Sequence, residues 1–123
     1  MVTKEEAVEY FRNTYDLQSD DGTWFSVIVG LDDNRQIISG IDLEENFCRI
    51  LTPIGCICES KLNDALDLMS EGIVGGLVRI GNKHCVNHAF FLDSMESPAD
   101  INVLVYAIAK IAYDIKEKIL GIN

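Results

Sequence analysis

The alternation of apolar and polar positions divides the chain into three segments with helical spacing and five with strand spacing. In the longest helical segment, 97–120, apolar residues recur every three or four positions along one broad face. Ser97 and Asp100 have the spacing of a capping box, and Gly121 follows the run as a typical helix-ending glycine. The pattern predicts one long helix that needs a large apolar partner surface.

Two shorter segments share this helical spacing. The first begins with a capping box of Thr3 and Glu6 and is expected to end near 15–17. The second spans about 61–71 and is followed by Gly72, which favours a stop there. Each carries a stripe of apolar side chains on one side. Both segments are therefore predicted to be amphipathic helices that cover a core.

Period-two alternation and short apolar runs predict five strands, over 24–31, 36–42, 47–59, 73–80 and 84–92. Polar, turn-forming residues at 18–23, 32–35 and 81–83 separate these elements. Pro53 interrupts the third strand. Because proline donates no hydrogen bond to a ladder, it predicts an edge position, a bulge or a break at that point.

The predicted order of elements is α-β-β-β-α-β-β-α. Short turns between consecutive strands favour a mainly antiparallel five-stranded sheet. The helices must then pack on this sheet, which predicts a two-layer α+β fold. No repeat or linker-like stretch interrupts the 123 residues, so a single domain over 1–123 is expected.

The balance of charged residues limits the classes of partner that the chain is expected to bind. Twenty acidic and ten basic residues give a net charge of −10, which argues against binding to a nucleic acid backbone. No apolar stretch has the length of a membrane span, and the first residues lack the basic and apolar regions of a signal peptide. We therefore expect a cytoplasmic protein without a membrane partner, its four cysteines being free thiols.

The order of elements over 62–119 resembles a known fold. A short helix (LNDALDLMSEG) precedes a strand, a Gly-Asn turn and a strand (GLVRIGNKHCVNHAFFL), then an acidic loop and a long aliphatic helix. This arrangement resembles the type III secretion chaperone-like fold, and within it the YbjN-like family of small bacterial proteins. The first half is similar in element order and in its hairpin, WFSVIVGLDDNRQIISGI. The resemblance implies a non-enzymatic, chaperone-like or regulatory homodimer that binds a partner polypeptide.

Four residues support an alternative of a different class. Cys56 and Cys58 are two apart on the third predicted strand, and His84 and His88 share one face of the fifth. Two thiols and two imidazoles would suit a tetrahedral zinc site, so a small metal- or redox-linked protein is the alternative function. Cysteine also packs readily as a small apolar group, and C-x-C is not the C-x2-C spacing of zinc fingers. No metal or cofactor is therefore assigned.

Consecutive aromatic residues point to a binding surface. In the pairs Trp24–Phe25 and Phe90–Phe91, one ring falls on each face of the sheet, so each pair needs a cover on both sides. The long helix is also more apolar than one sheet face requires. We predict a partner-binding surface and no catalytic residue, the surface being formed by Trp24, Phe25, Phe90, Val105, Ile108 and Ala112.

Overall fold

The computed structural model describes residues 1–32, 34–72 and 74–121. The described helices are α1 (Lys4–Thr14), α2 (Leu62–Met69) and α3 (Pro98–Leu120), with 3-10 turns η1 (Glu59–Lys61) and η2 (Leu92–Ser94). The described strands are β1 (Asp16–Asp20), β2 (Trp24–Asp32), β3 (Arg35–Leu43), β4 (Phe47–Gly55), β5 (Gly76–Ile80) and β6 (Lys83–Phe91).

The described strands form one antiparallel sheet in the order β1-β2-β3-β4-β6-β5. The α+β class is confirmed, but the predicted count of five strands is wrong. The additional strand, β1, spans the predicted end of the first helix, near 15–17, and the start of the predicted turn at 18–23. It pairs with β2 with a register shift between Leu17 and Ser19. Its sequence, DLQSD, carries no apolar alternation, so the neighbouring strand determines its conformation.

The third predicted strand is shorter than expected. β4 ends at Gly55, whose φ of +126° is a conformation that only glycine adopts without strain. Pairing with β3 ends at Leu51, and the register with β6 shifts between Pro53 and Gly55. Proline therefore stands beside a bulge, past the end of one ladder, as predicted. The predicted strand start at Ile73 and the turn residue Asp33 lie outside the described residues.

The helix ends follow the predicted signals closely. The Glu6 N–H donates to Thr3 Oγ1 at 3.2 Å, and the Thr3 N–H donates to Glu6 Oε1 at 3.1 Å. At α3 the Ser97 N–H donates to Asp100 Oδ2 at 3.2 Å, and Gly121 ends the helix in the left-handed conformation. The second helix is the exception, because α2 covers only eight residues and follows the 3-10 turn η1.

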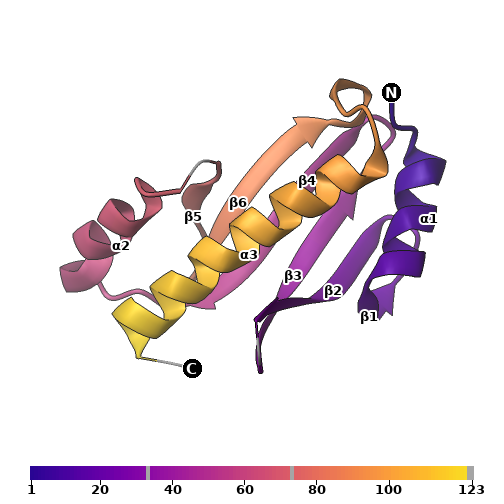
Figure 1. Cartoon of the computed structure of the whole chain (residues 1–123). Helices are drawn as coiled ribbons and strands as arrows, with labels where there is room; N and C mark the ends of the chain where they lie inside the picture. Colours follow the sequence, from indigo (N-terminus) through magenta and orange to yellow (C-terminus); the bar gives the residue numbers. More distant parts are fainter. Residues whose placement is uncertain (33, 73, 122–123) are drawn as a thin grey trace.

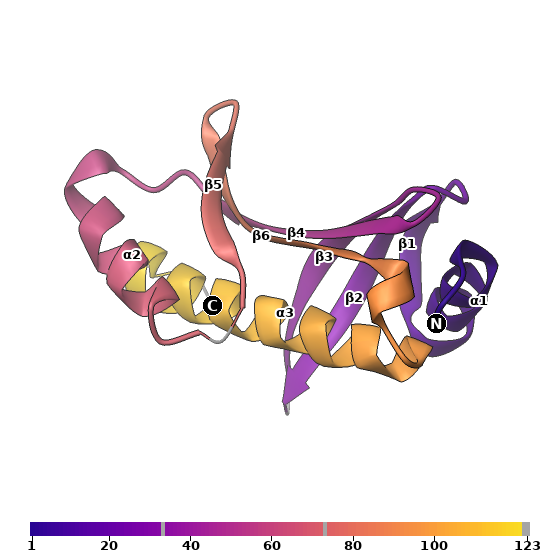
Figure 2. The ribbon, with the colours of Figure 1, turned by 90° about the horizontal axis from the view of Figure 1, so that it is seen from above.

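All three described helices lie on the same side of the sheet (Figures 1 and 2). The long helix α3 crosses the middle strands, while α1 and α2 lie at opposite ends of the molecule (Figure 1). The core between α3 and the sheet contains fully buried side chains from both layers, among them Phe25, Ile41, Ile50, Val86, Ile101, Val105, Ile108 and Ile115. Burial of this apolar surface is the main term that favours folding.

One polar contact interrupts this apolar core. Ser39 of β3 and Thr52 of β4 are fully buried on the helix-covered face, and their hydroxyl oxygens lie 2.8 Å apart. Each hydroxyl satisfies the other, so neither is left as an unpaired polar group.

Candidate functional site

The sheet face opposite the helices, which we call the open face, has no covering helix among the described residues (Figure 2). Because side chains alternate along a strand, the register places one set of residues together on this face. Its main members are Trp24, Ser26, Ile28, Ile38, Gly40, Asp42, Arg49, Leu51, Pro53, Val78, Ile80, Cys85, Asn87, Ala89 and Phe91.

A groove of about 310 Å³ crosses the open face. Trp24 helps to shape it, because the indole lies over Gly40 of the neighbouring strand. A methyl group at Gly40 would come within 2.5 Å of Trp24 Cζ2, so only glycine leaves room for this ring. The groove is lined mostly by apolar side chains, namely Trp24, Ile38, Leu51, Pro53, Ile80 and Cys85, together with Ser26, Gly40 and Lys83.

Several large apolar side chains of the open face are accessible to solvent. The exposed fractions are 37% for Trp24, 43% for Ile38, 52% for Ile80 and 61% for Phe91. Leu51 and Cys85 are almost buried and form the floor. Single exposed apolar residues are normal on a protein surface, but several on one sheet face are typical of an interaction surface.

Two polar atoms of the open face lack a hydrogen-bond partner among the described residues. They are Arg49 Nε and Asn87 Oδ1, on the adjacent strands β4 and β6. The Arg49 guanidinium forms an ion pair through another nitrogen, Nη2, which lies 3.9 Å from Asp42 Oδ2. Both atoms have almost no solvent-accessible area, so they are unpaired polar atoms within this face and are not presented to a partner as the face stands.

The six residues predicted for partner binding are not brought together. Trp24 lies on the open face, whereas Phe25 is fully buried beneath α1 with its ring 5.6 Å from that of Phe11. Phe90 is half-buried on the helix-covered face. Of the predicted surface, only Trp24 is therefore a substantially exposed member of the open face.

The α3 members of the predicted surface require a correction. Val105, Ile108 and Ala112 have no exposed area, because the chain's own sheet is broad enough to cover the whole apolar face of the helix. They cannot contact a partner while the chain is folded. Val103 and Tyr106, on the outer side of α3, are instead its exposed large apolar residues, and Val103 is 66% exposed.

Sequence reasoning missed Ile38 and Ile80, and it noted Phe91 as one ring of an aromatic pair but assigned Phe90 to the predicted surface instead. The signal was present, since Ile37–Ile38 and Phe90–Phe91 are adjacent apolar pairs with one member on each face. What was lacking was a way to decide which member faces the helices. The register supplies it, because Ile37 and Phe90 share the face of Val29 and Cys48.

The cysteines and histidines of the alternative function are also placed differently from the prediction. Cys56 and Cys58 lie beyond the end of β4, and both are exposed. His84 Nδ1 accepts a hydrogen bond from the Ile57 N–H at 3.1 Å, and the His88 ring stacks on Phe90. The described residues contain no group of three or more His, Cys, Asp or Glu side chains arranged to hold a metal ion.

The thiols divide into two environments. Burial raises the pKa of Cys48 to about 12, and burial also raises the pKa of Cys85. The pKa of exposed Cys58 is lowered, first by the hydrogen bond with Ser60 Oγ at 3.3 Å and less by the Lys61 backbone and charge. Of these three thiols, only Cys58 has a lowered pKa, and no imidazole lies in contact with it among the described hydrogen bonds.

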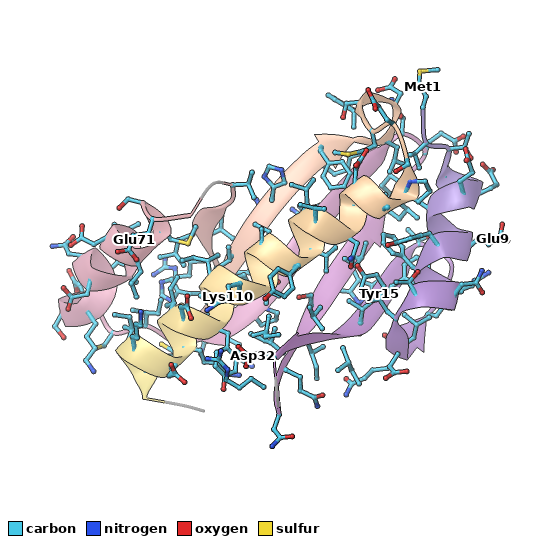
Figure 3. The ribbon with its side chains drawn as sticks, viewed as in Figure 1. Met1, Glu9, Tyr15, Asp32, Glu71 and Lys110 are labelled. Carbon is cyan, nitrogen blue, oxygen red and sulfur yellow. The ribbon has the colours of Figure 1, made fainter. Side chains whose placement is uncertain are left out.

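Polar contacts also occur on the helix side of the molecule. Tyr15 and Lys110, both labelled in Figure 3, lie beside and on α3. The Tyr15 hydroxyl donates to Asn102 Oδ1, and burial raises the pKa of Tyr15. Lys110 Nζ lies 3.0 Å from Asp114 Oδ1, one turn further along the helix. The outer helix layer therefore carries polar contacts as well as the exposed apolar residues Val103 and Tyr106.

None of the described helices is long and apolar enough to cross a membrane. Comparison of the chain with protein-family models and with curated proteins finds no match. The resemblance to a known family therefore stays a prediction, and the open face is the feature that bears most directly on function.

Proposed function

We propose that the chain is a non-enzymatic protein-binding module, chaperone-like or regulatory, that engages a partner polypeptide on the open face of its sheet. The observation that carries this proposal is the apolar groove on the face without helices, with Trp24, Ile38 and Ile80 exposed along it. A groove bordered by apolar side chains suits an extended segment that alternates apolar and polar residues.

The two unpaired atoms do not decide between a polypeptide and an apolar ligand. Arg49 Nε and Asn87 Oδ1 are both buried in the isolated chain, so a partner backbone would reach them only after neighbouring side chains move. The polypeptide is favoured instead by the groove itself, which extends over several strands and is lined mostly by apolar side chains.

The proposal includes two features that come from the sequence. One is a homodimer in the cytoplasm, as the resemblance to type III secretion chaperone-like and YbjN-like proteins implies. The exposed Val103 and Tyr106 on α3 give a second copy an apolar surface separate from the open face. The protein partner would then remain free to occupy the groove.

The single tryptophan of the chain, Trp24, provides the test, because it lies in the groove. Reduced, carboxymethylated ribonuclease A is a permanently unfolded polypeptide without tryptophan and serves as the probe. Binding should shift the Trp24 emission to shorter wavelength. Ile38→Asp, which places a charge in the groove, should weaken binding at least tenfold, whereas the matched variant Val103→Asp should leave it unchanged.

The same two variants test the homodimer. Light scattering should give twice the chain mass for the wild type and Ile38→Asp, and the mass of one chain for Val103→Asp. Equal binding of the probe by Ile38→Asp and the wild type would contradict the proposed use of the open face. A dimer lost in Ile38→Asp and retained in Val103→Asp would show that the open face is the dimer interface instead.

A further inference from the structure

A second hollow, which we call the hairpin cleft, lies where α2 meets the β5–β6 hairpin. Its volume is about 270 Å³, and its lining shares no residue with the groove of the open face. This volume is close to the lower end of the range for small-molecule sites. The lining residues are Leu62, Leu66, Leu77, Val78, Arg79 and His84.

His84 presents a fixed hydrogen-bond donor to the cleft. The residue is only 9% exposed, and its Nδ1 accepts the Ile57 N–H at 3.1 Å. A neutral imidazole carries its proton on the nitrogen that does not accept, so Nε2 is the donor. Among the described residues, Nε2 donates to no acceptor, and the imidazole is one of the groups that line the cleft.

Arg79 adds a positive charge beside this donor. Arg79 and His84 are direct partners across the β5–β6 ladder, so their side chains start about 5 Å apart on the same face. Within the described part of the chain, the other three arginines each pair with an aspartate, whereas Arg79 has no ion pair. A guanidinium and an N–H at this separation can hold the two oxygens of one carboxylate.

The rest of the cleft is aliphatic. Leu62 and Leu66 of α2 lie across it from Leu77 of β5, and Leu66 is about half exposed. Val78, the next residue of β5, borders the cleft but belongs to the open face, so its side chain does not point towards α2. Such walls favour a hydrocarbon chain. The net charge of −10 opposes every anion, but it opposes a ligand with a single negative charge less than a multiply charged one such as a phosphate dianion.

We propose that the hairpin cleft binds an aliphatic monocarboxylate, with the carboxylate held by Arg79 and His84 and the chain lying between α2 and β5. The site is independent of the open face, so its test does not depend on the function proposed above. Octanoate is the first probe and octan-1-ol, the same chain without the charge, is its control. Calorimetry should show octanol binding at least tenfold more weakly.

The same carboxylate chemistry occurs on a free acyl chain and on a chain-terminal aliphatic residue. N-acetylleucine is the probe for the second source, and the tighter binder of octanoate and N-acetylleucine identifies the natural class. Butyrate should bind more weakly than octanoate, because it leaves most of the aliphatic wall uncovered.

Two variants test the polar end of the site. Arg79→Gln removes the charge at an exposed position, and His84→Asn removes the Nε2 donor while an amide oxygen can still accept from Ile57. Each should weaken octanoate binding roughly 10- to 100-fold, the range for hydrogen bonds to a charged group. Lys4→Gln, an equal charge change on α1 at the far end of the molecule, should have no effect.

Arg79→Gln keeps the test decisive even where His84→Asn fails to fold, because Arg79 makes no ion pair in the described chain. The proposal is overturned if octanoate and octanol bind equally, if Lys4→Gln weakens octanoate as much as Arg79→Gln, or if neither carboxylate probe binds at millimolar concentration.

Discussion

Both faces of the sheet carry large apolar side chains, but the two faces have opposite surroundings. Along β3, Ile37, Ser39 and Ile41 point to the helices and are buried, whereas Ile38 on the other face is 43% exposed. The helix-covered face satisfies its only described pair of buried hydroxyls, while the open face leaves Arg49 Nε and Asn87 Oδ1 unpaired. The first face is thus complete within one chain, and the second has the features of a surface that still lacks a partner.

The largest difference between the faces is expected for a large-to-small substitution on one strand. Ile41→Ala removes a side chain with no exposed area and should destabilise the protein by about 3–4 kcal/mol. Ile38→Ala on the same strand should cost about 1 kcal/mol or less, because water already reaches that side chain. Urea unfolding followed by circular dichroism measures both. Equal losses would show that the open face is packed as a core.

The cysteine thiols allow the stability of the protein to be compared at neutral and alkaline pH. Cys48 lies on the helix-covered face, and burial raises its pKa from 9.0 to about 12. The folded thiol keeps its proton while the unfolded one loses it, so stability is full below pH 9 and falls as pH rises from 9 towards 12. At pH 10.5 the loss from Cys48 should be about 2 kcal/mol relative to pH 8.

The variant Cys48→Ala should remove this part of the alkaline loss. Cys58→Ala is the matched control, since the lowered pKa of that exposed thiol gives it no such effect. Urea titrations at pH 8 and 10.5 test the difference. If Cys48→Ala loses as much free energy of unfolding between pH 8 and pH 10.5 as the wild type does, the burial of this thiol is contradicted.

Polar groups on the two faces should respond in opposite ways. Thr52→Val leaves the Ser39 hydroxyl buried without its partner and should cost about 1–2 kcal/mol. Asn87→Val removes an oxygen that has no partner among the described residues, so stability should stay within about 0.5 kcal/mol or rise. Thermal unfolding compares the two variants. A loss for Asn87→Val as large as that for Thr52→Val would mean that Asn87 is already satisfied in the isolated chain.

The smallest effect is expected at the glycines of the open face. Gly40→Ala places a methyl group against the Trp24 ring and should cost about 1 kcal/mol while moving the indole towards water. Gly30→Ala is the control, because no atom lies within 4 Å of the added carbon there. The Trp24 emission should shift to longer wavelength in the first variant only. The same spectrum in both would show that the indole does not rest on Gly40.

Much of the fold could be predicted because local signals agreed with the final packing. The capping boxes at Thr3 and Ser97, the glycine at 121 and the bulge beside Pro53 are consequences of a few neighbouring residues. β1 could not be predicted in this way. Its residues have no strand pattern of their own, and they become a strand because β2 offers an edge to pair with.

The candidate surface was predicted only in part for a related reason. Alternation shows that Phe90 and Phe91 lie on opposite faces, but the side that carries the helices depends on how the whole chain packs. The same applies to α3, whose apolar breadth could equally have served a second subunit. Its burial on the sheet follows from the width of the six described strands together.

The irregular pairing of β1 has a consequence for solubility. β1 and β5 are the two margins of the sheet, where backbone groups are free to template a further strand. At β1, the shifted register and the carboxylates of Asp16 and Asp20 oppose the addition of another chain. β5 is equally short and carries the charge of Arg79, but its register with β6 has no shift, so it is the less protected of the two margins.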